Sequence, residues 1–294
     1  MRVSTSLLFL FATILLIGCG GNGESEADRM AEEHEGETPS ATEAARAPEI
    51  PVATETVNYT QTAEGEPVSG YLAAPANADS VLSARGMDPA ADSLPGIVVI
   101  HEWWGLNDNI RTATRRLAGQ GYRALAVDVY QGATATSSDS AQALMQRAMS
   151  QREQVMANLQ DAHNYLRTEA GAPRVAVMGW CFGGGRTFDA VAAAPTQYDA
   201  AVAYYGTPES MTTDVLRKTT TPILAHFGRK DQAVSAESAR DFQTRFQDVG
   251  AEGSIYFYDA GHAFANPSGE SYVSDAAEQA WSRTTDFLSQ YLYP

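Results

Sequence analysis

A glycine-rich run places a cysteine where a strand is expected to turn sharply into a helix. The apolar run that starts at Arg174 ends in Gly179-Trp180-Cys181-Phe182-Gly183, and small residues follow it. In a strand–turn–helix motif of this kind, the nucleophile lies at the tip of a turn so tight that side chains two positions away would collide with it. Glycines at both positions remove the collisions. The pattern therefore predicts that Cys181 is a nucleophile, with sulfur in place of the usual serine oxygen.

The expected position of Cys181 also favours its reactive form. A helix N-terminus stabilises a thiolate by ~0.3–1 kcal/mol at an exposed site and by more when partly buried. Two other interpretations stay open at this point: a buried, inert cysteine, or a turn that cradles a phosphate. The run lacks the G-x-G-x-x-G order of dinucleotide-binding turns.

A carboxylate and a histidine follow in the order that this motif requires. Asp231 comes after the apolar run Pro222 to Phe227 and a glycine turn, and His262 comes after the run Ser254 to Tyr258. Each could be an ordinary loop residue, but together with the cysteine they match the chain order nucleophile, acid, base. His262 would take the thiol proton and later activate water, and Asp231 would fix its tautomer.

A second polar cluster, His101-Glu102-Trp103-Trp104-Gly105, ends an earlier apolar run. The backbone amides of Trp103 and Phe182 are the candidates for an oxyanion hole. His101-Glu102 also begins a zinc-protease motif, but that motif needs histidine where this chain has Gly105. We therefore expect no metal.

Short apolar, β-branched runs alternate with helix-period segments from about residue 57. This alternation predicts an α/β fold, a mostly parallel central sheet with helices on both faces. The expected strands are Gly96 to His101, Ala124 to Val129, Arg174 to Trp180, Ala200 to Tyr205, Pro222 to Phe227 and Ser254 to Tyr258, after extended segments between Val57 and Ala73.

The N-terminus has the pattern of an export signal. Residues 1–18 hold an early arginine and a short apolar run, which predicts a signal peptide, and Leu16-Ile17-Gly18-Cys19 resembles a bacterial lipobox. The resemblance implies that Cys19 is lipidated and that the protein is an envelope lipoprotein, in the periplasm or at the cell surface. An ordinary secretory signal is the alternative. Both export the chain.

Residues 19–56 differ in composition from the rest of the chain. Residues 20–56 contain ten Asp and Glu against two Arg, which is about half of the net charge of −16. Such a segment is expected to be an unfolded acidic tether, with the catalytic domain spanning 57–294. The remaining charge is also negative, which disfavours nucleic acid as a partner. Cys19 and Cys181 are the two cysteines, so a lipidated chain forms no internal disulfide.

The motifs together resemble the dienelactone hydrolase family of the α/β-hydrolase superfamily. The likeness runs over about residues 57–292, through His101 to Gly105, Gly179 to Gly184 and Ala260-Gly-His-Ala-Phe264. It implies an α/β-hydrolase fold, and a pairing of Glu102 with the resting cysteine, whose proton Glu102 accepts when substrate binds. A simple loop cap is the alternative for Glu102. We expect the substrate site to include Trp104, Tyr205, Phe264 and Asn266.

The resemblance implies a substrate whose carboxylate is held by two arginines, and this sequence lacks both. Asn266 stands at the position of one arginine. Residues 137–140, which include no arginine, fill the region of the other. Arg186 or Arg229 could compensate. We therefore expect a hydrolase of a small ester or lactone, without a redox or nucleotide cofactor. A binding module without turnover, or an acyltransferase or peptidase with the same triad, is the alternative. The sequence favours no oligomeric state.

Overall fold

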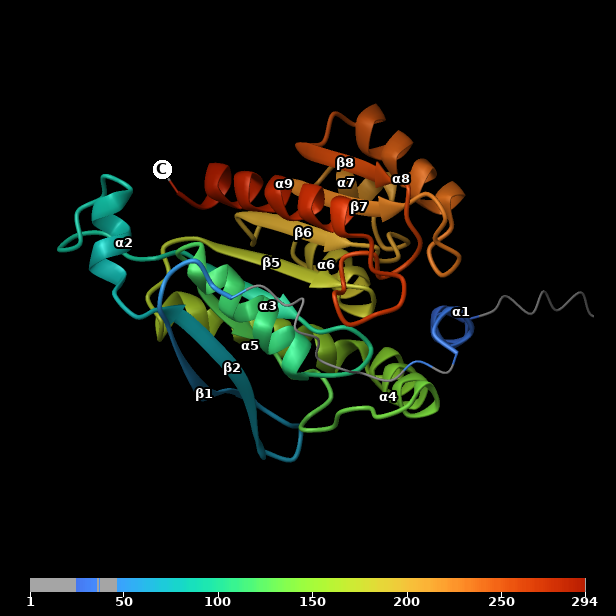
Figure 1. Cartoon of the computed structure of the whole chain (residues 1–294), viewed down its shortest axis with the longest axis horizontal. Helices are drawn as coiled ribbons and strands as arrows, with labels where there is room; N and C mark the ends of the chain where they lie inside the picture. Colours follow the sequence, from blue (N-terminus) through green and yellow to red (C-terminus); the bar gives the residue numbers. More distant parts are fainter. Residues whose placement is uncertain (1–24, 36, 38–46, 294) are drawn as a thin grey trace, which may run out of the picture.

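The computed structural model describes residues 25–35, 37 and 47–293. The predicted signal peptide (1–18) and Cys19 lie outside these residues. The described chain forms one eight-stranded sheet with the strand order β1-β2-β4-β3-β5-β6-β7-β8 (Figure 1). The strands are β1 (Val52–Gln61), β2 (Pro67–Pro75), β3 (Gly96–Ile100), β4 (Arg123–Ala126), β5 (Val175–Trp180), β6 (Ala200–Tyr204), β7 (Ile223–Gly228) and β8 (Gly253–Tyr258).

Six strands, β3 to β8, run parallel, and β2 joins them antiparallel through β4. Every residue of β3, β5, β6 and β7 is buried, as expected for parallel strands covered on both faces. The predicted α/β fold is confirmed, and each predicted strand lies within a few residues of an observed one. The β1–β2 hairpin forms the antiparallel edge.

Helices cover both faces of the sheet. Figure 1 shows α3 and α9 in front of it and α5 and α6 behind it. The helices are α1 (Glu26–Glu33), α2 (Ala78–Ala84), α3 (Asp108–Gly119), α4 (Ser138–Ser150), α5 (Arg152–Thr168), α6 (Phe182–Ala193), α7 (Thr213–Leu216), α8 (Ala236–Asp248) and α9 (Ser274–Leu292). Among the described helices, none has both the length and the apolar character required to cross a bilayer.

The segment expected to be an unfolded tether contains ordered structure. Ser25 caps α1 through a capping box with Asp28, and Ala27 and Met30 are fully buried. β1 also begins earlier than expected, at Val52. The interpretation of 19–56 as unfolded is therefore wrong for the described part of that range. Composition alone missed α1 because its few apolar residues are spaced along one face.

Candidate active site

Cys181 occupies the turn between β5 and α6 with a strained backbone. Its φ of 56° and ψ of −120° lie where side chains are rarely found, and it is 2% exposed. A Cβ on Gly179 would stand closer than 3.0 Å to the backbone of Gly183, and one on Gly183 would do the same to the backbone of Ile100. These are the collisions that the sequence pattern predicted. The strand-to-helix turn therefore presents Cys181 as a nucleophile elbow does.

His262 and Asp231 form a buried pair beside this turn. The Nδ1 of His262 lies 2.8 Å from Oδ2 of Asp231, and neither side chain is exposed. The other carboxylate oxygen accepts the backbone N–H of Val234 at 2.7 Å. The Nε2 of His262 has no hydrogen-bond partner among the described residues, and a ring nitrogen of His262 lies within 4.8 Å of Sγ of Cys181. The three predicted catalytic residues therefore meet in one place.

The charges of the site favour an ion pair. Burial raises the pKa of the Cys181 thiol, but the positive charges of His262 and His34 and their hydrogen bonds to the sulfur together outweigh burial, and the pKa falls to about 7. Burial lowers the pKa of His262, but the negative charges of Asp231 and Cys181 raise it well above its usual value. At neutral pH a substantial fraction of the pair is thiolate and imidazolium, the reactive state of a cysteine nucleophile.

The predicted oxyanion-hole amides flank the same turn. Phe182 is the first residue of α6, and Trp103 follows β3, whose Ile100 pairs with Gly179 of β5. Both side chains are buried. This placement brings the two candidate backbone amides to the carboxyl edge of neighbouring strands, the edge at which Cys181 lies. The pairing of these amides with a substrate oxygen stays a prediction.

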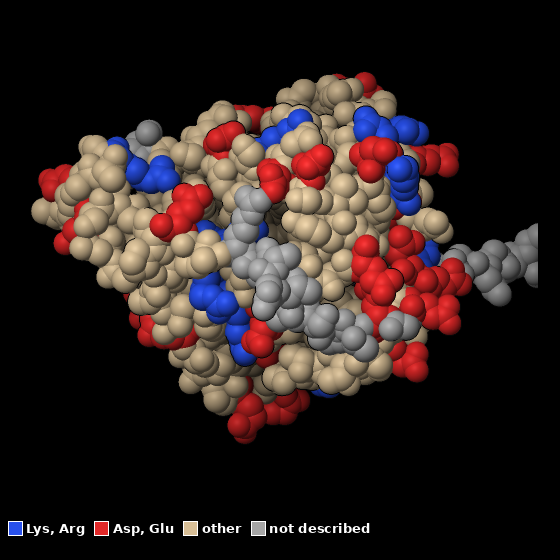
Figure 2. All heavy atoms as spheres, in the orientation of Figure 1, with Lys and Arg blue, Asp and Glu red and all other residues tan. Residues whose placement is uncertain are grey.

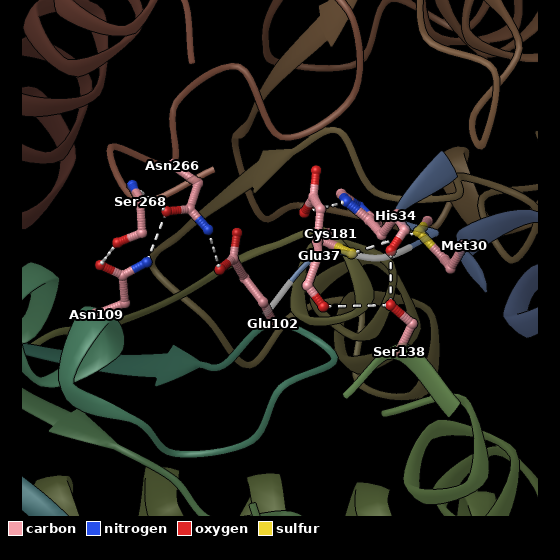
Figure 3. A network of polar contacts seen from close by, with 9 residues as sticks. All are labelled: Met30, His34, Glu37, Glu102, Asn109, Ser138, Cys181, Asn266 and Ser268. Carbon is pink, nitrogen blue, oxygen red and sulfur yellow. Dashed lines mark hydrogen bonds and ion pairs between the residues drawn. The ribbon is translucent and has the colours of Figure 1, made fainter. Parts of the chain in front are cut away.

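Glu102 does not pair with the resting cysteine in this structure. Its Oε2 accepts a hydrogen bond of 2.8 Å from Nδ2 of Asn266, whose Oδ1 in turn accepts from Asn109 at 2.6 Å (Figure 3). The sulfur of Cys181 lies instead 3.5 Å from Sδ of Met30. Burial and the nearby thiolate raise the pKa of Glu102 to about 8. Glu102 is therefore largely neutral at pH 7 and held by an amide.

Comparisons with known proteins agree with this geometry. Residues 82–292 match the dienelactone hydrolase family. The chain belongs to this family. Its relatives include an Escherichia coli K12 protein provisionally named carboxymethylenebutenolidase, 29% identical over 79% of this chain and 90% of that protein. Protein usf of Aquifex pyrophilus is 31% identical over 67% of this chain and 89% of that protein.

Solved structures of other proteins have the same fold as this chain. The crystal structure of a provisionally assigned dienelactone hydrolase from Klebsiella pneumoniae superposes with a TM-score of 0.68 at 26% identity, covering 82% of this chain and all of that one. A dienelactone hydrolase-like promiscuous phosphotriesterase from metagenomic libraries has a TM-score of 0.68 at 22% identity, covering 82% of this chain and 98% of that one, a likeness of fold. The chain is thus a hydrolase of the dienelactone hydrolase family with an α/β-hydrolase fold.

A cavity of about 270 Å³ lies beside the site, between α3 and α9. Glu102, Tyr205 and Asn266 contribute to its wall, together with Trp180, the residue before Cys181. Two of the four residues expected to bind substrate, Tyr205 and Asn266, thus line it. The other two do not: Trp104 packs against Trp103, and the fully buried Phe264 packs against Tyr205 and Tyr258.

Neither Arg186 nor Arg229 is free to bind a substrate carboxylate in this structure. The buried Arg186 pairs with Asp189 at 2.9 Å and with Glu26 of α1 at 3.4 Å. Arg229 is exposed and donates to the backbone carbonyl of Phe257. Asn266, where the resemblance implies a family arginine, donates its amide N–H to Glu102.

Sequence reasoning missed two residues that reach Cys181, Met30 and His34. His34 is 3% exposed, and burial lowers its pKa, but hydrogen bonds with Cys181 and Glu37 raise it to about 9. His34, Cys181 and His262 offer one sulfur and two nitrogens within 4.8 Å of one another, the donor types that Zn²⁺ accepts. The Ser25–Asp28 capping box and the spacing of Ala27, Met30 and His34 were the available signals.

Proposed function

We propose that this protein hydrolyses a small ester or lactone through a thioester on Cys181. The observation that carries the proposal is the strained turn that presents Cys181 within reach of the buried His262–Asp231 pair. A positive φ at a non-glycine residue persists only where the surrounding structure enforces it, and such strain is concentrated at functional sites. Membership of a hydrolase family supports the same reaction.

The reaction would proceed in two steps. In the first, the Cys181 thiolate attacks the acyl carbon, a C–S bond forms, and the amides of Trp103 and Phe182 stabilise the oxyanion. The C–O bond then breaks, and the imidazolium of His262 gives its proton to the leaving alkoxide. In the second step neutral His262 takes a proton from water as the hydroxide adds to the thioester. The C–S bond then breaks, the acid leaves, and the thiolate and imidazolium are restored. Asp231 stabilises the imidazolium throughout.

The cavity between α3 and α9 would hold the group attached to the scissile bond. Aromatic side chains of Trp180, Tyr204, Tyr205 and Trp281 line it, which suits a flat or apolar group. Its volume of about 270 Å³ is at the small end for a ligand pocket, in keeping with a small substrate. The substrates best matched to this lining are neutral esters and lactones, because Asn266 replaces the family arginine and the wall holds Glu278 as well as Arg116, so the two charges offset each other.

We also propose that the chain is exported and anchored to a bacterial envelope membrane through Cys19. The support is the arginine and apolar run of residues 1–18, followed by a lipobox-like sequence at 16–19. Radiolabelled palmitate incorporation into the full chain in a bacterial host, lost in the Cys19→Ala variant, tests this. Equal labelling of both chains would contradict it.

The hydrolase proposal is tested with the chain from Gly20 onwards, which keeps every described residue. Hydrolysis of a series of p-nitrophenyl esters and of a dienelactone is measured beside Cys181→Ala. We expect turnover by the parent chain that the variant lacks. Equal inertness across the panel would favour a binding module on a hydrolase scaffold, and equal activity would assign the reaction to another residue.

A further inference from the structure

The N-terminal segment lies across the proposed nucleophile. Sδ of Met30, on α1, is 3.5 Å from Sγ of Cys181, and Met30 is fully buried (Figure 3). A reacting carbonyl carbon must itself come to about 3–3.5 Å from the sulfur before a bond forms. The sulfur of Met30 therefore occupies, at 3.5 Å from Sγ, one of the positions that a reacting carbonyl carbon would take. His34, one turn further on, packs its ring 5.2 Å from Trp103 and 5.5 Å from His262.

Polar contacts hold the segment at both ends of α1. At its start, Glu26 pairs with Arg186 at 3.4 Å and accepts a hydrogen bond from Thr207 at 3.0 Å. At its end, the backbone carbonyl of His34 accepts from Ser138 at 2.6 Å. All of these partners belong to the catalytic domain.

Two further contacts, both partly buried, lie along α1. Arg29 donates to the carbonyl of Ala233 at 3.1 Å, and Asp28 accepts from Gln142 of α4 at 2.9 Å. The segment is thus fixed by side chains from several loops and helices around the site. Its outer surface is acidic, and Figure 2 shows carboxylates gathered on the right-hand side of this face, where α1 lies.

The helix depends on this docking. An eight-residue helix is too short to be stable alone in water. Its buried face, Ala27, Met30 and His34, has i, i+3 and i, i+4 spacing, so the three side chains contact the domain together. Loss of the docked state therefore releases the whole segment, and no covalent bond has to break.

We propose that residues 25–35 are an intramolecular inhibitor whose binding surface is the part of the catalytic domain around Cys181. Docked, the segment covers Cys181 from the side of Met30; released, it exposes the sulfur. Its effect on turnover rests on the proposed function, but its effect on access to the thiol does not. The occupant of the surface is this chain's own segment, since Glu26 complements Arg186 and Met30 fills the space above the sulfur.

Met30→Asp in the chain from Gly20 tests the inference, because a carboxylate in place of the buried thioether opposes docking. Glu32→Gln is the matched control, since Glu32 lies on the exposed face of the same helix. The rate of iodoacetamide alkylation at Cys181, the one thiol of this chain, is followed to a pH at which the thiol is fully ionised, so that the plateau reports access without turnover and without the effect of His34 on the thiol pKa. The kcat/KM for a p-nitrophenyl ester is measured in parallel. The near-ultraviolet circular dichroism spectrum verifies that the domain is folded.

We expect Met30→Asp to raise both rates about tenfold or more, the effect of opening a site that is closed at least nine-tenths of the time. Glu32→Gln should leave both rates within twofold of the parent. A peptide of residues 25–35 should slow alkylation of Met30→Asp again, and the same peptide with aspartate at position 30 should not.

Equal alkylation rates in the parent and Met30→Asp would overturn the inference, as would a Glu32→Gln acceleration of the same size. Faster alkylation without ester turnover would uphold the occluding segment and count against the proposed hydrolase. Strong turnover with equal alkylation rates would support the proposed hydrolase and overturn the occluding segment.

Discussion

Nδ1 of His262 lies 2.8 Å from Oδ2 of Asp231, and both side chains are fully shielded from solvent. Asp231 is held in turn by the N–H of Val234. The carboxylate thus fixes which ring nitrogen of His262 is left for the thiol.

Asp231→Asn should lower kcat/KM by about 10²–10⁴-fold, because the nearly isosteric amide no longer stabilises the imidazolium or its tautomer. Steady-state ester hydrolysis measures this. Asp259→Asn is the control, since Asp259 is exposed and pairs with Lys230 at the surface. A rate for Asp231→Asn within twofold of the parent would show that the pair has no catalytic role.

The pH dependence of thiol alkylation should report the lowered pKa of Cys181. A folded-state pKa of about 7, below the ordinary value of about 8.5, means that the thiolate is present above pH 7 and is lost as the pH falls through 7. The alkylation rate should therefore rise with a midpoint near pH 7. In His262→Gln the midpoint should move up, because the positive charge of His262 is gone.

The control for this profile is the same chain unfolded in urea, where the midpoint should return to about 8.5. A folded-state midpoint equal to the unfolded one would mean that no thiolate–imidazolium pair forms. An unchanged midpoint in His262→Gln would assign the lowered pKa to another group.

Gly183→Ala should destabilise the domain strongly. The added methyl would stand against the backbone of Ile100 in β3, where neither element can move without breaking the sheet. We expect a loss of at least about 3 kcal/mol in the free energy of unfolding, or roughly 6–12 °C in Tm. Differential scanning calorimetry measures it. Gly269→Ala, where the nearest atom is 3.7 Å away, should unfold at nearly the parent Tm.

Asn266→Arg should shift substrate preference towards anions. Asn266 lines the cavity and takes the position of a family arginine, so a guanidinium there can bind a substrate carboxylate. We expect the ratio of kcat/KM for a dienelactone over that for a neutral ester to rise about tenfold, in line with a charge-assisted hydrogen bond of ~1.5–3 kcal/mol. Asn266→Gln should leave this ratio near that of the parent. An unchanged ratio in Asn266→Arg would mean that the carboxylate of the dienelactone does not bind beside residue 266.

Much of the fold, and the meeting of Cys181 with Asp231 and His262, could be predicted from local patterns. The runs at Gly96 and Arg174 are continuously apolar because β3 and β5 are covered on both faces, so their positions were predictable. Gly179 and Gly183 flank Cys181 because any Cβ there would meet backbone. This requirement is local and can be seen in the sequence.

The state of Glu102 and the role of the N-terminal segment could not be predicted in the same way. Glu102 bonds Asn266, 164 residues later, and this choice depends on how two loops meet at the edge of the sheet. Met30 lies in a strongly acidic stretch whose composition is typical of unfolded chain. Its contact with Cys181, 151 residues away, depends on a tertiary surface that no local pattern encodes.

The most direct test that Cys181 is the nucleophile is the intact mass of the Met30→Asp chain, quenched rapidly during turnover of p-nitrophenyl acetate. The control is the double variant Met30→Asp, Cys181→Ala. We predict an added acetyl group on the peptide that contains Cys181, together with nitrophenol release, and neither in the double variant. Nitrophenol release at equal rates by both chains would contradict the assignment of Cys181 as the nucleophile.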